Sequence, residues 1–138
     1  MNDISLLKQA LPYLRHHKKS TVVVKLGGEI AANKEALASL AGDVSLLVHV
    51  GIRIVLVHGG GPQATEMQKR LGLEPLMVDG RRVTDEATLD VAKMIFGGRI
   101  NTDILSALRA QGVSAVGLSG VDGDILHATK RPPTEVTD

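Results

Sequence analysis

The sequence predicts an α/β fold, a three-layer α/β/α sandwich in which a mostly parallel sheet has helices on both faces. Two observations support this prediction. Short runs rich in valine and isoleucine alternate with longer segments whose apolar residues recur at helical spacing. Two of those runs, at residues 21–26 and 53–58, are followed by glycine-rich loops. Ligands of such sheets bind at the carboxyl ends of the strands, where these loops would lie.

The composition excludes several classes of protein. Hydrophobic residues make up 43% of the 138 residues and aromatic residues 1%, which indicates one folded domain with an aliphatic core. A net charge of +1 gives no basic surface for nucleic acid or for an anionic membrane. Cysteine is absent, so disulfides and thiolate ligands are excluded. With no signal-peptide pattern, we expect a cytoplasmic protein without nucleic-acid or membrane partners.

Residues 1–20 are predicted to form a kinked helix and a basic connector. Apolar residues recur at helical spacing over residues 2–17, and Pro12 interrupts the pattern. A proline inside a helix removes one hydrogen bond and crowds the preceding turn. The basic run at residues 15–19 suits the negative end of the helix dipole and is too short for a nucleic-acid tail.

The first strand–helix–strand unit follows. Residues 21–26 are β-branched and apolar up to Lys25, as expected of a strand covered on both faces. Asn33 is predicted to cap the next helix, which Gly51 should end. Residues 53–58 predict a second buried strand.

The middle of the chain predicts a helix, a hairpin and two further helices. Pro62 should open a helix that Gly72 closes. Residues 76–83 predict a hairpin, because their central Asp-Gly pair suits a type I′ turn. Thr84 is predicted to cap the next helix, and the glycine pair at 97–98 should break it.

The last part of the chain predicts an incomplete architecture. A helix should end at Gly112, a strand should occupy residues 113–118, and residues 121–124 repeat the Asp-Gly hairpin signal. Residues 130–138 follow without a closing helix. We therefore expect the described pattern to stop in the middle of an architecture.

The two glycine loops are the strongest indication of function. Gly27 and Gly28 follow the first strand and Lys25, while residues 59–61 follow the second strand and lead into Pro62. Bare backbone N–H groups and a helix N-terminus can hold an anion without a dedicated cation. The sequence thus predicts a site for phosphoryl or carboxylate groups.

Three mechanisms could use such loops. A dinucleotide site requires G-x-G-x-x-G, but here the glycines are contiguous. An esterase could use His-Gly-Gly-Gly as an oxyanion hole, but the nearest nucleophile elbow, at residues 117–121, ends in valine instead of glycine. Phosphoryl transfer accounts for both loops and for Lys25. The histidines show no metal-ligand spacing, so no metal site is predicted.

Four motifs, in order along the chain, closely resemble the acetylglutamate kinases of the amino acid kinase family. They lie at residues 24–28, 57–63, 79–85 and 115–123. The resemblance implies phosphorylation of the side-chain carboxylate of N-acetyl-L-glutamate by ATP with Mg²⁺, a step of arginine biosynthesis. The hairpin at 76–83 resembles the substrate lid of this family.

The same resemblance implies the site residues. Lys25 would stabilise the transferring phosphoryl group, and Arg82 would grip the α-carboxylate of the substrate through its planar guanidinium. The remaining residues would act through their backbone: Gly60 and Gly61 on the substrate, and Gly27 and Gly28 on the phosphoryl oxygens.

Family members continue for about as many residues again, and the missing half holds most of the ATP site. The resemblance therefore implies that residues 21–138 form the N-terminal, acetylglutamate-binding lobe of the kinase fold and that the ATP-binding lobe is absent. Expected partners are further copies in a dimer or hexamer, or a complementary C-terminal half. Two alternatives stay open: the kinase-like domain of an acetylglutamate synthase, and a non-catalytic binding or assembly module.

Overall fold

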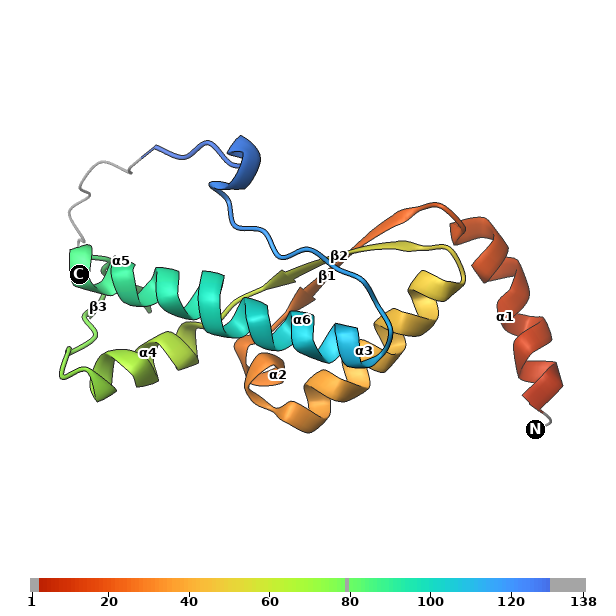
Figure 1. Ribbon diagram of the computed structural model, residues 1–138, viewed down its shortest axis with the longest axis horizontal. Coiled ribbons are helices and arrows are strands. Elements are labelled where there is room, and N and C mark those ends of the chain that lie inside the picture. The colour runs from red at the N-terminus through yellow and green to blue at the C-terminus, as the bar shows by residue number, and fades with distance from the viewer. Residues whose placement is uncertain (1–2, 79, 130–138) are drawn as a thin grey trace.

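A two-stranded parallel sheet forms the centre of the molecule, and helices pack against it (Figure 1). The computed structural model describes residues 3–78 and 80–129. Strands β1 (Thr21–Leu26) and β2 (Arg53–His58) pair in parallel, with Thr21 opposite Arg53 and Leu26 opposite His58. The second sheet is a small antiparallel hairpin of β3 (Met77–Val78) and β4 (Arg81–Arg82). The helices are α1 (Asp3–His17), α2 (Gly28–Ala32), α3 (Lys34–His49), α4 (Gly61–Arg70), α5 (Glu86–Ala92), the π-helix η1 (Lys93–Ile100), α6 (Asn101–Ala110) and the 3₁₀ turn η2 (Asp122–Asp124).

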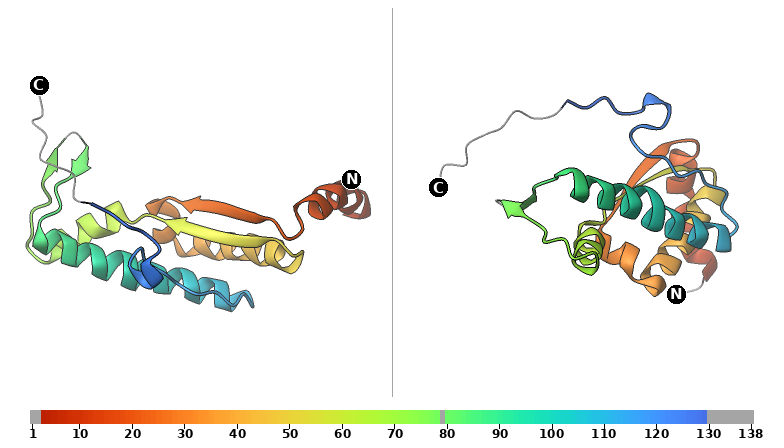
Figure 2. Two further views of the ribbon diagram at one scale, coloured as in Figure 1. Left: turned by 90° about the horizontal axis from the view of Figure 1, so that it is seen from above. Right: turned by 60° about the vertical axis from the view of Figure 1, so that its left-hand side comes forward.

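Helix α1 projects from one end of the molecule, away from the other helices (Figures 1 and 2). It runs as one helix with Pro12 inside it, over nearly the range that the sequence predicts. Ile4, Leu7 and Tyr13 are 60–71% exposed, so this helix buries little of its apolar surface within the described chain. The connector turns at Lys19, whose φ is +70°, and its N–H donates to the carbonyl of Gly51 at 2.8 Å.

The first predicted strand–helix–strand unit is confirmed. The side chain of Asn33 accepts from the N–H groups of Glu35 and Ala36 at 2.9 and 3.0 Å and so caps α3. The chain leaves this helix through Gly51, whose φ of +91° favours glycine. Helix α3 and helix α6 lie on the same side of the two strands (Figure 2).

The sheet is covered on one face in the part of the chain that the structure describes. Val24 and Leu26 alternate with Val23 along β1; the first two face the core, whereas Val23 is 64% exposed. On β2, Val55 and Val57 are 46% and 48% exposed on the same outer face. The expectation of strands covered on both faces is therefore wrong for the described residues. The third layer of the sandwich stays a prediction.

The predicted helix break at the glycine pair 97–98 is wrong. The chain continues from α5 through the π-helix η1 into α6 without interruption. Glycine in a helix costs about 1 kcal/mol relative to alanine. Burial of Ile95 and Ile100, which are 1% and 2% exposed, offsets that cost. The wider π turns also direct side chains of this segment toward the second glycine loop, as described below.

The predicted strand at 113–118 is also wrong, because the segment is irregular. It lies against α6 instead of the sheet: Gly117 contacts the side chain of Asn101 at the start of that helix. A strand is stabilised by cross-strand pairs, and the structure assigns none to this segment. Its outer side chains are exposed, with Val116 at 81% and Leu118 at 61%.

The second Asp-Gly signal forms the 3₁₀ turn η2 instead of a hairpin. Gly123 and Asp124 have φ values of +57° and +61°, so the positive φ that the signal predicts is present without strand pairing. Asp122 accepts hydrogen bonds from the N–H and the hydroxyl of Ser119 at 2.5 and 2.8 Å. These bonds, that of the backbone first, hold the pKa of the Asp122 carboxyl below its ordinary value.

The hydrophobic core lies between the parallel sheet and the helices α3 and α6, and it extends to the glycine loops. Its buried members are Leu26, Leu37, Ala41, Val44, Ala64, Val91, Ile95, Ile100, Ile104, Leu108 and Val113. They are aliphatic, as the composition predicts. Among the described helices, none is both long and apolar enough to cross a membrane.

Candidate functional site

The two glycine loops meet at the carboxyl ends of β1 and β2. The N–H of Gly59 donates to the carbonyl of Leu26 at 3.2 Å, which joins the loops directly after the strands. A Cβ on Gly28 would lie 3.1 Å from Cδ of Pro62 and 3.6 Å from Cα of Gly60. The structure thus brings together the loops that the sequence singled out, and they are close enough to act on one ligand.

Gln63 links the two loops through its side chain. Its amide nitrogen donates to the carbonyl of Gly28 at 2.5 Å, although the residue belongs to α4. The side chain is 6% exposed, and its amide oxygen has no hydrogen-bond partner among the described residues. Gln63 lies in the motif that carries the family resemblance, but its role as a link is visible only in the structure.

Gly60 is required by close packing. A Cβ at this position would lie 2.7 Å from Cε1 of Phe96 and would also collide with Ile100. Both side chains come from η1, so the π-helix presses directly on the second loop. π-Helical turns are frequent at functional sites, because they direct side chains that a regular α-helix would not.

Both loops lead into helices whose first N–H groups are not capped by a side chain. Gly27 is the N-cap of α2 and Gly60 is the N-cap of α4, and neither carries a capping group. Pro62 lies in the first turn of α4, where its missing N–H costs nothing. Backbone donors are therefore left for an anion beside the loops.

Lys25 lies on β1, two residues before Gly27, and faces the exposed side of the sheet. Its partner across the sheet is Val57, the second-last residue of β2. The strand thus places Lys25 at the same edge as the two loops. Convergence of its ammonium group with the loop amides stays a prediction.

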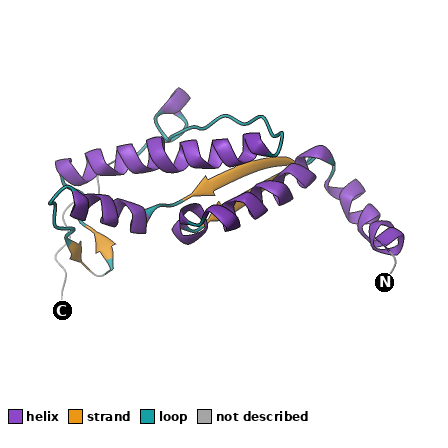
Figure 3. Ribbon diagram, turned by 60° about the horizontal axis from the view of Figure 1, so that its bottom comes forward, coloured by secondary structure: helices purple, strands orange, loops and turns teal. Residues whose placement is uncertain are grey.

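Arg82 is anchored to helix α4. Its Nη2 donates to the carbonyl of Gly61 at 3.1 Å and to the hydroxyl of Thr65, and its Nη1 donates to the side-chain oxygen of Gln68. Arg82 comes from β4, whose hairpin lies beside the ends of α4 and α5 (Figure 3). The structure therefore brings this predicted arginine to the second glycine loop.

The hairpin pairs as the sequence predicts, with Met77 opposite Arg82 and Val78 opposite Arg81. Gly80 has a φ of +69°, as the turn requires. Asp79, the other half of the predicted turn, lies outside the described residues. The hairpin is thus confirmed as an element, and its predicted role as a lid stays a prediction.

Three further residues of this arginine site were missed at the sequence level: Thr65, Gln68 and Thr88. Gln68 is 1% exposed, and its amide nitrogen donates to the hydroxyl of Thr88 at 2.9 Å. A signal was present, because Gln68 follows Ala64 by four residues and so lies on the inner face of α4. A polar residue there requires a buried partner.

Asp85, not Thr84, caps helix α5. Its carboxylate accepts from the N–H of Thr88 at 2.8 Å. Hydrogen bonds from Thr88, that of the side chain first and that of the backbone second, lower the pKa of the Asp85 carboxyl. The cap thus also fixes Thr88, the partner of the buried Gln68.

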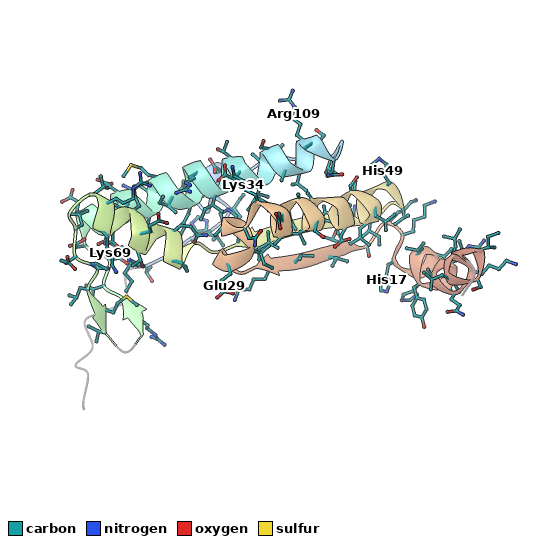
Figure 4. The ribbon with its side chains drawn as sticks, turned by 90° about the horizontal axis from the view of Figure 1, so that it is seen from below. His17, Glu29, Lys34, His49, Lys69 and Arg109 are labelled. Atoms are coloured by element: carbon teal, nitrogen blue, oxygen red, sulfur yellow. The ribbon has the colours of Figure 1, made fainter. Side chains whose placement is uncertain are left out.

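The histidines of the strand-entry end lie far from the loops. Figure 4 shows His17 at the end of α1 and His49 at the end of α3, where the chain enters the strands. His49 is hydrogen-bonded within α3, through Nδ1 to the carbonyl of Ser45 at 2.7 Å. Within residues 3–78 and 80–129, no group of three or more His, Cys, Asp or Glu side chains could hold a metal ion.

The fold is that of an α/β domain whose two parallel strands end in adjoining glycine loops. A model of the amino acid kinase family matches residues 20–137, and the chain belongs to that family. It is 43% identical over 130 residues to an acetylglutamate kinase of Symbiobacterium thermophilum, covering 94% of this chain and 44% of that protein. An acetylglutamate kinase of Methanoregula boonei is 48% identical, with 94% and 45% covered. The predicted family is confirmed.

The chain is also similar to a solved structure of an N-acetylglutamate synthase. That protein, from Neisseria gonorrhoeae, was solved with coenzyme A and N-acetyl-glutamate. The TM-score is 0.72 at 30% identity, over 84% of this chain and 27% of the synthase chain. This chain spans less than half the length of the curated relatives it matches.

Proposed function

We propose that this chain is the acetylglutamate-binding lobe of an acetylglutamate kinase. The reaction is the ATP-dependent phosphorylation of the side-chain carboxylate of N-acetyl-L-glutamate in arginine biosynthesis. The observation that carries the proposal is the position of Arg82, whose guanidinium bonds to Gly61 beside the two joined glycine loops. The similarity to acetylglutamate kinases at 43–48% identity supports the same substrate.

Each predicted residue has a distinct task in this reaction. Arg82 holds the α-carboxylate of acetylglutamate, because hydrogen bonds from a charged guanidinium to a carboxylate are among the strong ones. The amides of Gly60 and Gly61 hold the substrate near its reacting carboxylate. The amides of Gly27 and Gly28 and the ammonium of Lys25 stabilise charge on the phosphoryl group as it moves.

ATP with Mg²⁺, when bound, would supply the phosphoryl group that the substrate carboxylate receives, with an acyl phosphate and ADP as the products. The described residues fit the phosphoryl end of this cofactor, since both loops offer uncapped N–H groups. They offer no acidic cluster for the metal ion. On the family resemblance, we assign the rest of the ATP site to a second lobe.

The outer face of the sheet supports a partner of this kind. Val23, Val55 and Val57 are 46–64% exposed there, beside Lys25. A C-terminal lobe, or further copies of the chain in a dimer or hexamer, would cover this face and complete the three-layer sandwich. Because phosphoryl transfer needs donor and acceptor aligned, this chain alone should have little turnover. The reaction would take place in the cytoplasm.

Two measurements test the proposal. Calorimetry should detect binding of N-acetyl-L-glutamate to the chain, and Arg82→Ala should abolish it. Arg81→Ala is the matched control, because Arg81 is the exposed neighbour on the same strand. Adding a complementary C-terminal half should restore ATP-dependent hydroxamate formation from acetylglutamate and hydroxylamine. A folded chain that binds no acetylglutamate would instead indicate a pure assembly module.

The second candidate function is the kinase-like domain of an acetylglutamate synthase. The solved synthase structure favours it, at a TM-score of 0.72. In such a protein another domain performs the acetyl transfer, so Lys25 would have no catalytic task. Lys25→Ala in the assembled protein distinguishes the two. A kinase should lose most of its turnover with little change in acetylglutamate affinity, and a synthase should keep its activity.

A further inference from the structure

We propose that Gln68, held by Thr88, positions Arg82 for the carboxylate of the substrate. The inference rests on the proposed function for the identity of that carboxylate, and on the structure for the anchoring itself. It assigns a positioning role to a buried residue of α4 that no sequence motif of the site contains.

The first argument is burial. Gln68 is 1% exposed and Thr88 is 6% exposed, so both polar side chains have left water. Buried polar groups are costly unless they are hydrogen-bonded, and these two bond to each other at 2.9 Å. A long polar side chain at this position of the core indicates a task beyond packing, since methionine would fill the same space without that cost.

The second argument is direction. An arginine carries only donors, so the amide of Gln68 must turn its oxygen toward Nη1 of Arg82. Its nitrogen then faces Thr88, whose hydroxyl oxygen accepts the bond. A flipped amide would set a donor against the guanidinium. Gln68 therefore has one orientation, and that orientation fixes Arg82.

The third argument is the support behind the pair. The N–H of Thr88 is held by the carboxylate of Asp85 at the cap of α5. A continuous set of bonds thus runs from α5 through Gln68 on α4 to Arg82 on β4. The short hairpin that carries Arg82 has two residues in each strand and cannot fix a long side chain alone.

The fourth argument is that some N–H donors of Arg82 stay available for a ligand. A guanidinium has five N–H donors, and the bonds to Gln68, Thr65 and Gly61 take three of them. Among the described residues, Nε and one hydrogen of Nη1 are left for a ligand. Arg82 is thus held by its far end in a fixed place, while its charge and one donor, from Nε or from Nη1, can meet a carboxylate. Pre-organisation of this kind reduces the cost of ordering on binding.

The test uses the full chain and begins without ligand. Nitrogen-15 NMR of the arginine side chains should show separate Nη signals for Arg82, assigned by their loss in Arg82→Lys. Gln68→Met keeps the volume and removes the acceptor, so these signals should merge, because only the two bonds of Nη2 then resist rotation of the guanidinium. Gln68→Glu keeps an oxygen toward Nη1 and should keep them separate. Lys69→Met, at the exposed position next to Gln68 on the same helix, should leave them unchanged.

The second part adds N-acetyl-L-glutamate and its α-carboxamide analogue in calorimetry. Gln68→Met should weaken binding of the acid about tenfold, as expected for loss of one bond to a charged group, and binding of the amide much less. A structural defect would weaken both ligands alike. If Gln68→Met does not fold, Thr88→Val carries the test, because it keeps the shape of Thr88 and removes its hydroxyl.

The outcomes separate the two proposals. Separate Arg82 signals that persist in folded Gln68→Met, or merged signals in the wild-type chain, would overturn the positioning role. Equal weakening of the acid and the amide would also overturn it. If the signals respond as expected but the wild-type chain binds no acetylglutamate, the anchoring of Arg82 holds and the proposed function fails.

Discussion

The loop end of the molecule and the outer face of its sheet are built in opposite ways. At the loop end, Arg82, Gln68 and Thr88 satisfy one another within the chain, and the loops touch at Gly28 and Gly60. On the outer face, the valines Val23, Val55 and Val57 are 46–64% exposed. At the loop end, these polar side chains find their hydrogen-bond partners within the chain. The outer face of the sheet is instead apolar like a protein interior but exposed like a surface. The comparison teaches that the residues proposed to bind the substrate can be held in place by the chain itself, while nothing among the described residues covers the outer face of the sheet.

The largest expected effect compares the two faces of β1. Leu26→Ala should lower the free energy of unfolding by about 3 kcal/mol, because it opens a cavity at a side chain that is 1% exposed. Val23→Ala on the outer face should cost about 0.5 kcal/mol or less, as for an exposed residue. Urea unfolding of both variants measures the difference. Equal costs would show that the outer face is buried in solution, for instance between two copies of the chain.

The next effect tests the packing of the second loop. Gly60→Val should destabilise the chain by about 2 kcal/mol, because its side chain would overlap Phe96 and Ile100. Gly59→Ala is the matched control, since a Cβ at Gly59 meets no atom within 4 Å. Thermal and urea unfolding measure both. If Gly60→Val unfolded like the wild type, η1 would not press on the loop, and the argument for a pre-formed site would fail.

The sequence predicted the elements that local chemistry determines. The glycine loops, the Asn33 cap and the hairpin around Gly80 each follow from residues near in sequence, and the structure contains all three. The family was also predictable, because its motifs are local. The predictions that were wrong concern elements that depend on contacts between residues far apart in the sequence. The strand at 113–118 requires a neighbour to pair with, and the helix break at 97–98 was overridden by burial of Ile95 and Ile100.

The same distinction holds for the site. Arg82 and the glycines were named from motifs, and the structure joins them through bonds of Arg82 to α4. Gln68 and Thr88 were not predicted, because their role depends on contacts between α4, α5 and β4. Residue spacing within a single element does not encode such contacts. A buried polar position on a predicted inner helix face was the signal that could have indicated Gln68.

The smallest expected effect is a pH dependence at the cap that supports Thr88. Hydrogen bonds from Thr88 lower the pKa of Asp85 from its ordinary value of 3.8. A carboxyl whose pKa is lower in the folded state stabilises that state above its ordinary pKa, and this contribution is lost as pH falls through the folded-state pKa. Asp85→Asn keeps an acceptor for the N–H of Thr88 but does not titrate there. The difference in unfolding free energy between wild type and Asp85→Asn should therefore be constant near neutral pH and change below about pH 4.

Thr84→Ala is the control for that measurement, because Thr84 is the cap that the sequence predicted and Asp85 is the cap in the structure. It should leave the acid part of the stability curve unchanged. An acid response that follows Thr84→Ala and not Asp85→Asn would move the cap by one residue. The hydrogen bond from the N–H of Thr88 to the carboxylate of Asp85 would then not exist. The support of Gln68 and Arg82 by residues of the same chain would lack this last bond. The difference between the internally bonded loop end and the exposed outer face of the sheet would then be smaller.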